Sequence, residues 1–313
     1  MKKLFTILSL TLLFTSVSFA ASKSLVYEKE FALDSISSIK TNLASEDLFI
    51  KPSKNTLFYV EIYCNKNIYP TVSLRDNQLL LETPNHVSLR NYNCSVHVYI
   101  PENTQMDSIL LRGSSCDISI GELYSQSIKI VTSSGEISAN YLCAESIDIT
   151  ASSGDIFAEE IDSDTCYIKA SSGDILINDL DTNEASITSS SGSVELSKCD
   201  CEFLECKSTS GDVDVSNIIS NELNISTTSG TITVGLDSIP SYASEITTTS
   251  GSVYLYVPQD QGFDLVFETT SGSFVDKIED RKFSPRGEFK DGYYDGGTEI
   301  FVETTSGSFV LDY

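Results

Sequence analysis

Carboxylates are the side chains of this sequence best suited to chemistry, because it has 45 Asp and Glu residues and many recur at a fixed spacing. Paired carboxylates can cleave glycosidic bonds or hold calcium. Asp155 and Asp174 occupy equivalent places in neighbouring repeats, yet Ser193 interrupts the column before Asp212. No repeat departs from the pattern to build a catalytic cleft, and the Gly-Gly-x-Gly-x-Asp calcium repeat is absent. The carboxylates therefore favour a non-enzymatic protein, with a polysaccharide lyase or hydrolase on a parallel β-helix as the alternative.

Thiols and imidazoles offer a second kind of chemistry. Cys199, Cys201 and Cys206 lie close together in the chain, as zinc ligands do, but no histidine is near them and two of these thiols are expected to point inward. The two histidines, His86 and His97, lie in no nucleophile motif, and His97 belongs to an alternating, strand-like segment. We therefore predict no metal, no cofactor and no catalytic residue.

An internal repeat sets the elements that position these side chains. Ser-Ser-Gly or Thr-Ser-Gly recurs every 19 residues, and the spacing loosens to 21 and then to 35 near the carboxyl terminus. The repeat glycines are Gly135, Gly154, Gly173, Gly192, Gly211, Gly230, Gly251, Gly272 and Gly307, and Cys116 takes the equivalent place before the first. A triplet present in every repeat indicates a structural role for its serines rather than that of a nucleophile. Each glycine is expected at a sharp turn, with a positive φ.

Apolar columns within the repeat predict the fold class. Apolar residues stand two and four places after most of the glycines, and a second alternating stretch follows an apolar corner. Alternation with a step of two is typical of a strand with one buried face. A single coil cannot bury that face, so successive coils must stack. We predict an all-β protein, a parallel β-solenoid of two-strand coils stacked ~4.8 Å apart into a rod of roughly 45 Å.

The same pattern divides the chain into five segments. Lys2 and Lys3 precede a short apolar run and small residues that end at Ala20, which is the layout of a cleavable signal peptide. The segments are 1–20, the signal peptide; 21–106, a hairpin-rich N-terminal β cap with a degenerate first coil at 44–50; 107–275, the regular repeats; 276–299, a basic and aromatic insertion; and 300–313, the final coil. We expect an exported protein that is periplasmic, at the cell surface or secreted.

Charge restricts the partners. The net charge of -25 is repelled by nucleic acid and by anionic lipid surfaces, which bind Lys and Arg. The apolar run of the signal is short for a membrane span, and no later segment approaches the length of a membrane helix. We therefore predict neither nucleic-acid binding nor membrane insertion.

The insertion carries the one cluster of cations and aromatic residues in this acidic sequence. Its candidate partner-binding residues are Lys277, Arg281, Lys282, Phe283, Arg286, Phe289, Tyr293 and Tyr294. Aromatic and Arg side chains commonly anchor partners on loops. The alternative is a hairpin that covers the last coils and pairs its cations with the protein's own carboxylates, and the sequence leans towards this second interpretation.

The eight cysteines suggest one disulfide rather than a framework. Cys166, Cys199 and Cys206 take columns held elsewhere by Leu and Ile, as small buried apolar side chains do. Cys64 and Cys94 fall on cap strands that can lie side by side, so they are the candidate disulfide pair.

The motifs together resemble a known family. A signal sequence, a cap that ends in Val98-Tyr99-Ile100-Pro101, Ser-Ser-Gly-Asp-Ile coils and a terminal Thr304-Thr305-Ser306-Gly307-Ser308-Phe309 are similar to the bacterial DUF4097 family of adhesin candidates. The resemblance implies a non-enzymatic extracytoplasmic β-solenoid that acts as a binding or structural module at the cell envelope, with adhesion as the leading role. Its partner would be a glycan or an envelope or host-surface protein. A cation-stabilised structural spacer is a further alternative.

Overall fold

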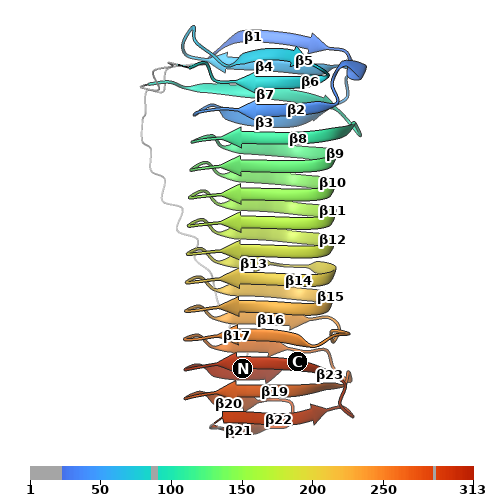
Figure 1. The fold of residues 1–313 in the computed structure, drawn as a ribbon, viewed down its shortest axis with the longest axis vertical. Helices are drawn as coiled ribbons and strands as arrows, with labels where there is room; N and C mark the ends of the chain where they lie inside the picture. The colour runs from blue at the N-terminus through green and yellow to red at the C-terminus, as the bar shows by residue number, and fades with distance from the viewer. Residues whose placement is uncertain (1–22, 86–90, 285–286) are drawn as a thin grey trace, which may run out of the picture.

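The computed structural model describes residues 23–85, 91–284 and 287–313. Its strands join into one sheet that winds into a tall rod, as Figure 1 shows. The predicted all-β parallel solenoid is thereby confirmed. The predicted signal peptide, His86 and Arg286 lie outside the described residues. In the part of the chain that is described, no helix is long and apolar enough to cross a membrane.

The strands fall into an N-terminal group, a central stack and a C-terminal group. The N-terminal group is β1 (Ser24–Phe31), the 3-10 turn η1 (Leu33–Ser35), β2 (Ser38–Asn42), β3 (Asp47–Ser53), β4 (Phe58–Cys64), β5 (Thr71–Arg75), β6 (Gln78–Glu82) and β7 (Cys94–Pro101). The central stack is β8 (Gln105–Gly113), β9 (Ile118–Thr132), β10 (Ile137–Ala151), β11 (Ile156–Ala170), β12 (Ile175–Ser189), β13 (Val194–Leu196), β14 (Cys199–Ser208), β15 (Val213–Thr227), β16 (Ile232–Leu236), β17 (Ser244–Thr248) and β18 (Val253–Tyr256). The C-terminal group is β19 (Phe263–Thr269), β20 (Ser273–Asp276), β21 (Arg281–Phe283), β22 (Gly287–Tyr293), β23 (Thr298–Thr304) and β24 (Ser308–Asp312).

Most regular coils are one continuous strand rather than the two short strands expected. In β10, a strand of 15 residues, buried positions step by two along each straight part. They step by three at each corner, as from Ala139 to Leu142 and from Ala144 to Ile147. A corner thus skips one residue while pairing with the next coil continues, so the strand turns without a break. From β9 to β12 every pair keeps the repeat register, for example Ile137 with Ile156, and equivalent apolar side chains form continuous buried columns.

Close stacking, not a positive φ, requires the repeat glycines. A Cβ atom on Gly154 would lie 1.8 Å from the carbonyl oxygen of Gly135, and one on Gly192 would lie 2.0 Å from that of Gly173. Of the glycines that the structure describes, Gly287 and Gly296 have a positive φ, and neither belongs to the repeat. The expectation of a positive φ at the repeat glycines was therefore wrong: the turns of adjacent coils approach too closely for any side chain.

A buried hydroxyl three residues before the glycine joins adjacent turns. Thr227 donates a hydrogen bond to the carbonyl of Gly211, 3.0 Å away, and accepts one from the amide of Gly230 at 3.3 Å. The same two bonds are made by Thr132, Ser189, Ser208 and Thr248. Ala151 and Ala170 occupy this position in two coils and have no hydroxyl. The hydroxyl satisfies buried backbone groups that the turn leaves unpaired.

The stacked aspartates also hold backbone. Asp174 Oδ1 accepts a hydrogen bond from the amide of Ser193 at 2.8 Å, and Asp212 Oδ1 accepts one from the amide of Thr231 at 2.7 Å. Each carboxylate therefore caps the turn of the next coil. This role explains the Asp of the repeat without calcium or catalysis.

The chain does not stack in sequence order at either end. At the carboxyl end, the last coil (β23 and β24) lies between the coil of β17 and β18 and the coil of β19 and β20. Figure 1 shows the carboxyl terminus at the level of β23, away from the tip of the rod. At the amino end, β2 and β3 likewise lie between β6 and β7 on one side and β8 and β9 on the other. Antiparallel strands then cover the outermost coils: β4 and β5 at the amino end, β21 and β22 at the carboxyl end.

The hydroxyl at the turn gives a direct test of this stacking. We expect Thr227→Ala to lower the free energy of unfolding by about 1 to 3 kcal/mol, because two buried backbone groups lose their partner. Thr227→Ser retains the hydroxyl and should stay within about 1 kcal/mol of the wild type, whereas Ala170→Ser, which adds a hydroxyl, should be neutral or stabilising. Urea unfolding followed by circular dichroism measures all three, and equal midpoints for Thr227→Ala and Thr227→Ser would refute the role of the hydroxyl.

Candidate functional site

An outward-facing group of aromatic residues on the N-terminal group of strands is the candidate binding surface. Burial alternates along β4, over 47–51 of β3 and over 96–100 of β7, so the half-buried side chains between the buried ones face outward. Pairing of β7 with both β3 and β4 brings the outward residues of the three strands together. We call this surface the aromatic platform; it consists of Phe49, Tyr59, Tyr63, His97 and Tyr99.

The rings of the platform are in contact and half-buried. His97 stacks on Phe49 with ring centroids 4.7 Å apart, and Tyr63 meets His97 edge-on at 5.3 Å. Tyr59 and Tyr99, directly opposite each other on β4 and β7, have centroids 5.7 Å apart. Such contacts hold the rings in fixed orientations while leaving part of each exposed.

Two acids and one base are set among the rings, and the hydroxyl of Tyr59 donates a hydrogen bond to Glu28 at 3.1 Å. Glu61 accepts hydrogen bonds from the hydroxyls of Tyr63 at 3.2 Å and Tyr99 at 3.1 Å. Lys51 lies 5.3 Å from the centroid of Phe49 and 3.1 Å from His97 Nδ1. These groups supply polar contacts beside aromatic faces, which is how sites for polar ligands with apolar faces are built.

The rings of the platform themselves are uncharged at neutral pH. Burial, reinforced by the hydrogen bond with Glu61, raises the pKa of Tyr99 to about 12. Burial and then the charge of Lys51 lower the pKa of His97 below its usual value. The tyrosine hydroxyls therefore remain donors and the imidazole remains uncharged. His97 is a strand residue, as its sequence context predicts, and its Nε2 lies 3.3 Å from the hydroxyl of Ser95, which is buried.

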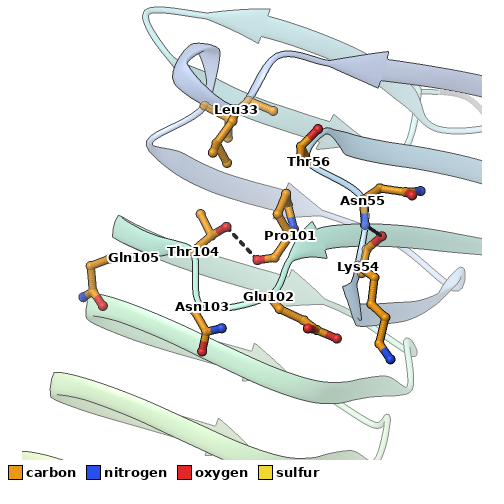
Figure 2. Close-up of a pocket in the computed structure, with 11 residues that line it drawn as sticks. Leu33, Lys54, Asn55, Thr56, Pro101, Glu102, Asn103, Thr104 and Gln105 are labelled. Atoms are coloured by element: carbon orange, nitrogen blue, oxygen red, sulfur yellow. Dashed lines mark hydrogen bonds between the residues drawn. The ribbon is translucent and has the colours of Figure 1, made fainter.

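Two depressions continue the surface beyond the platform. One, of about 370 Å³, is lined by Tyr59 and Asn55 together with Glu28, Lys29 and Glu30 of β1. Asn55 also lines the second, of about 790 Å³, which Figure 2 shows between the loop after β3 and the turn from β7 to β8. Lys54 and Glu102 are both exposed and lie at this second depression. The platform thus adjoins an open polar groove of two parts.

The predicted insertion is built largely into the rod. Asp276, with a fully buried side chain, accepts hydrogen bonds from Arg281 at 2.6 and 2.9 Å and from the hydroxyl of Tyr293 at 2.8 Å. Arg281 also pairs with Asp291 at 2.6 Å. This network fastens β21 and β22 to the outermost coil, and burial raises the pKa of Tyr293.

The remaining predicted partner-binding residues divide into packed and exposed ones. Phe283 and Phe289 contact Phe274 of the outermost coil, with centroids 5.4 and 5.2 Å away. Lys277 is exposed and pairs with Asp312 at 2.7 Å. Lys282 and Tyr294 are exposed, and the Tyr294 hydroxyl contacts that of Tyr313. The structure therefore brings Arg281, Phe283, Phe289 and Tyr293 together as a cover for the rod, which is the alternative that the sequence favours, and leaves Lys282 and Tyr294 outside it.

Cysteine positions agree with the predicted columns. Cys166, Cys199 and Cys206 are buried, as expected for small apolar side chains. Cys64 and Cys94 are directly opposite each other on β4 and β7, and all eight cysteines are free thiols in the structure. The Cys64–Cys94 disulfide stays a prediction. Among the described residues, no group of three or more His, Cys, Asp or Glu side chains is arranged to hold a metal ion.

The fold and this surface define a class: an all-β solenoid with a covered end and an aromatic surface patch. The chain belongs to the Toastrack DUF4097 family, whose profile matches residues 36–180 and again 140–311. The two overlapping matches reflect the internal repeat. The predicted family is thereby confirmed.

The chain also matches solved structures, at low sequence identity. An adhesin candidate from Parabacteroides distasonis is 10% identical, with a TM-score of 0.42 and coverage of 94% of this chain and 98% of that chain. An adhesin candidate from Parabacteroides merdae is 12% identical, with a TM-score of 0.42 and coverage of 92% and 95%. A lipid-binding candidate from Parabacteroides distasonis is 14% identical, with a TM-score of 0.36 and coverage of 92% and 96%. No curated protein matches the chain.

The buried carboxylate at the carboxyl end predicts unequal roles for two cations. We expect Arg281→Met to lower the free energy of unfolding by about 2 to 4 kcal/mol, because it leaves Asp276 buried without its counter-charge. Lys277→Met removes a solvent-exposed ion pair and should cost less than about 1 kcal/mol. Denaturant unfolding compares the two variants; equal effects would contradict a stabilising role for the Arg281–Asp276 pair.

Proposed function

We propose that this protein is a non-enzymatic, exported binding protein of the cell envelope, adhesin-like in role, which holds a neutral glycan on the aromatic platform. The observation that supports this function is the platform itself: five half-exposed rings in mutual contact, with two acids and one base among them. The regular coils serve as a rigid support that carries this surface away from its point of attachment.

The ligand class follows from the chemistry of the surface. A sugar ring has an apolar face that packs on an aromatic ring and a rim of hydroxyls that need donors and acceptors. Tyr99 and Glu61 supply polar groups beside exposed ring faces. The net charge of -25 opposes polyanionic ligands, so an uncharged glycan fits better than an acidic one.

Three alternative functions have less support. Enzymatic cleavage would need free, paired carboxylates, whereas Asp174 and Asp212 accept hydrogen bonds from backbone amides of the next coil. Binding by the insertion would need available cations and rings, whereas Arg281 and Tyr293 are committed to Asp276. A pure spacer accounts for the coils but not for the platform. Binding therefore fits best.

A glycan screen with matched tyrosine variants tests the proposal. We expect the mature wild-type protein to bind one or more neutral glycans saturably, and Tyr59→Ala/Tyr99→Ala to weaken that binding about 30-fold or more, because central aromatic contacts dominate binding energy. The control is Tyr167→Ala on β11: this tyrosine is also exposed and also hydrogen-bonded to a carboxylate, Glu184 at 3.2 Å, and should leave affinity unchanged.

The outcomes separate the alternatives. Wild-type affinity in the platform variant, with its fold verified by circular dichroism, would move the site elsewhere. A screen without any glycan ligand would refute the ligand class, and capture of a defined envelope protein in its place would favour a protein partner. Glycan turnover would restore the enzymatic alternative.

A further inference from the structure

Two neighbouring cysteines at a corner of the rod are arranged unlike the other thiols. Cys199 and Cys201 begin β14, and both side chains point inward because the residue between them faces out. Their sulfur atoms are 3.4 Å apart, with the Cys199 thiol donating to Cys201. Cys64 and Cys94 also interact through their thiols, but they face each other across two strands, whereas Cys199 and Cys201 lie in one strand.

Cys201 occupies a column of small polar residues rather than an apolar one. In register below and above it stand Thr182 and Ser220. In the coils below, Ser163 and Thr182 hydrogen-bond to each other at 3.1 Å, and Cys201 Sγ continues this ladder, 3.4 Å from Ser220 Oγ. Cys201 thus carries a thiol where the coils on either side carry a hydroxyl, and that thiol donates to Ser220.

An open cavity gives access to Cys201. The cavity, of about 270 Å³, is lined by Cys201 with Thr182 and Ser220, and Cys199 does not line it. Cys201 is 8% exposed and Cys199 only 1%. One thiol is therefore accessible from solvent and the other is directly behind it, which is the arrangement of an attacking and a resolving cysteine.

The acidities of the thiols support the same division. The hydrogen bond from Cys199 lowers the pKa of Cys201, and a hydrogen bond with Ser220 acts in the same direction. The hydrogen bond with Cys201 and then burial raise the pKa of Cys199. Cys166, fully buried among apolar columns, has its pKa raised by burial to about 12. Only the thiolate attacks, so reactivity is expected at Cys201.

We propose that Cys199 and Cys201 are a redox-active dithiol that exchanges with an external disulfide. The Cys201 thiolate attacks one sulfur of the disulfide RSSR, a new S–S bond forms, and the first RS⁻ leaves. Cys199 then gives up its proton, its sulfur attacks Cys201, and the second RS⁻ leaves. The dithiol loses two electrons, RSSR gains them, and two RSH result once the leaving thiolates are protonated.

The spacing makes this bond reversible rather than a permanent link. Residues i and i+2 of an extended strand are nearly 7 Å apart at Cα, which is the upper limit for a disulfide. Closure therefore bends the strand at its corner, and bonds of this kind are readily reduced. The proposal does not depend on the glycan-binding function, because the pair lies on the central stack and not on the platform.

Thiol exchange on the folded full chain tests the dithiol. The protein is reduced, freed of reductant and treated with oxidised glutathione, then alkylated and digested with trypsin. Cleavage after Lys198 and Lys207 releases one peptide with Cys199, Cys201 and Cys206, in which fragmentation locates the bond. We expect a Cys199–Cys201 disulfide, with Cys206 alkylated only after unfolding. Cys64 and Cys94 lie in other peptides and are scored separately.

Single variants assign the steps. Cys199→Ser should trap glutathione on Cys201, Cys201→Ser should lose the reaction by about tenfold or more, and Cys206→Ser should react as the wild type. Circular dichroism verifies the fold of each variant. The proposal is overturned if folded wild-type protein keeps both thiols reduced, if Cys199→Ser carries no glutathione on Cys201, or if Cys206 reacts as fast as Cys201.

Discussion

The rest of the structure depends on contact between the turns of successive coils. At each turn, the glycine of one coil lies so close to the carbonyl of the next that a Cβ would overlap it, at 1.8 Å for Gly154. This contact fixes both the spacing and the register of the coils, because a shift of one residue would place a side chain against a carbonyl. The hydroxyl of Thr227 and its equivalents then completes the backbone hydrogen bonds that this closeness would otherwise bury. Apolar columns stabilise the rod, but the register set by the turn contacts determines which residues form these columns.

A stack fixed in this way has two exposed ends, and both are closed by the same device. An open strand edge invites pairing with other chains. Here the first and the last coil of the chain are inserted one place inward, and the outermost coils are then covered by antiparallel strands. Insertion gives each of these two coils pairing partners on both sides, so β24 cannot fray without breaking its ladders with both β18 and β20. The buried Asp276 with Arg281 and Tyr293 adds a polar fastening where the apolar columns end.

Sequence alone predicts the repeating part of this molecule well and its ends poorly. The period of 19, the inward columns and the parallel pairing all follow from local alternation, because each coil stacks between two coils with the same sequence pattern. The sequence does not show that the last coil is placed between two other coils, because its repeat motif at Gly307 would fit either end of the stack equally well. The reason for glycine was also missed, because close approach depends on a neighbouring coil and φ does not. The sequence does identify segment 276–299, and the contacts of its residues fit the interpretation of that segment as a cover for the last coils. The aromatic platform was not found, because Phe49, His97 and Tyr99 come from strands whose pairing the sequence does not show, although each stands at an outward position of an alternating strand.

In a repetitive fold, the positions that break a column carry the most information about function. Each position in a column normally holds a residue that packs well against the equivalent residues of the neighbouring coils. A residue of another type at that position needs another explanation. Phe49 pairs with Ser119 in the neighbouring coil, and Ser119 in turn hydrogen-bonds Ser138 at 3.1 Å, so the platform begins where small hydroxyl residues give way to rings. Cys201 places a thiol in a column that Ser163, Thr182 and Ser220 fill with hydroxyls and Ala144 with a methyl group, whereas Cys166 and Cys206 fill apolar columns that would accept Ile or Leu. The same side chain therefore stands in two kinds of column. Packing explains Cys166 and Cys206, and the proposed thiol exchange concerns the cysteine that contacts a hydroxyl and lines a cavity.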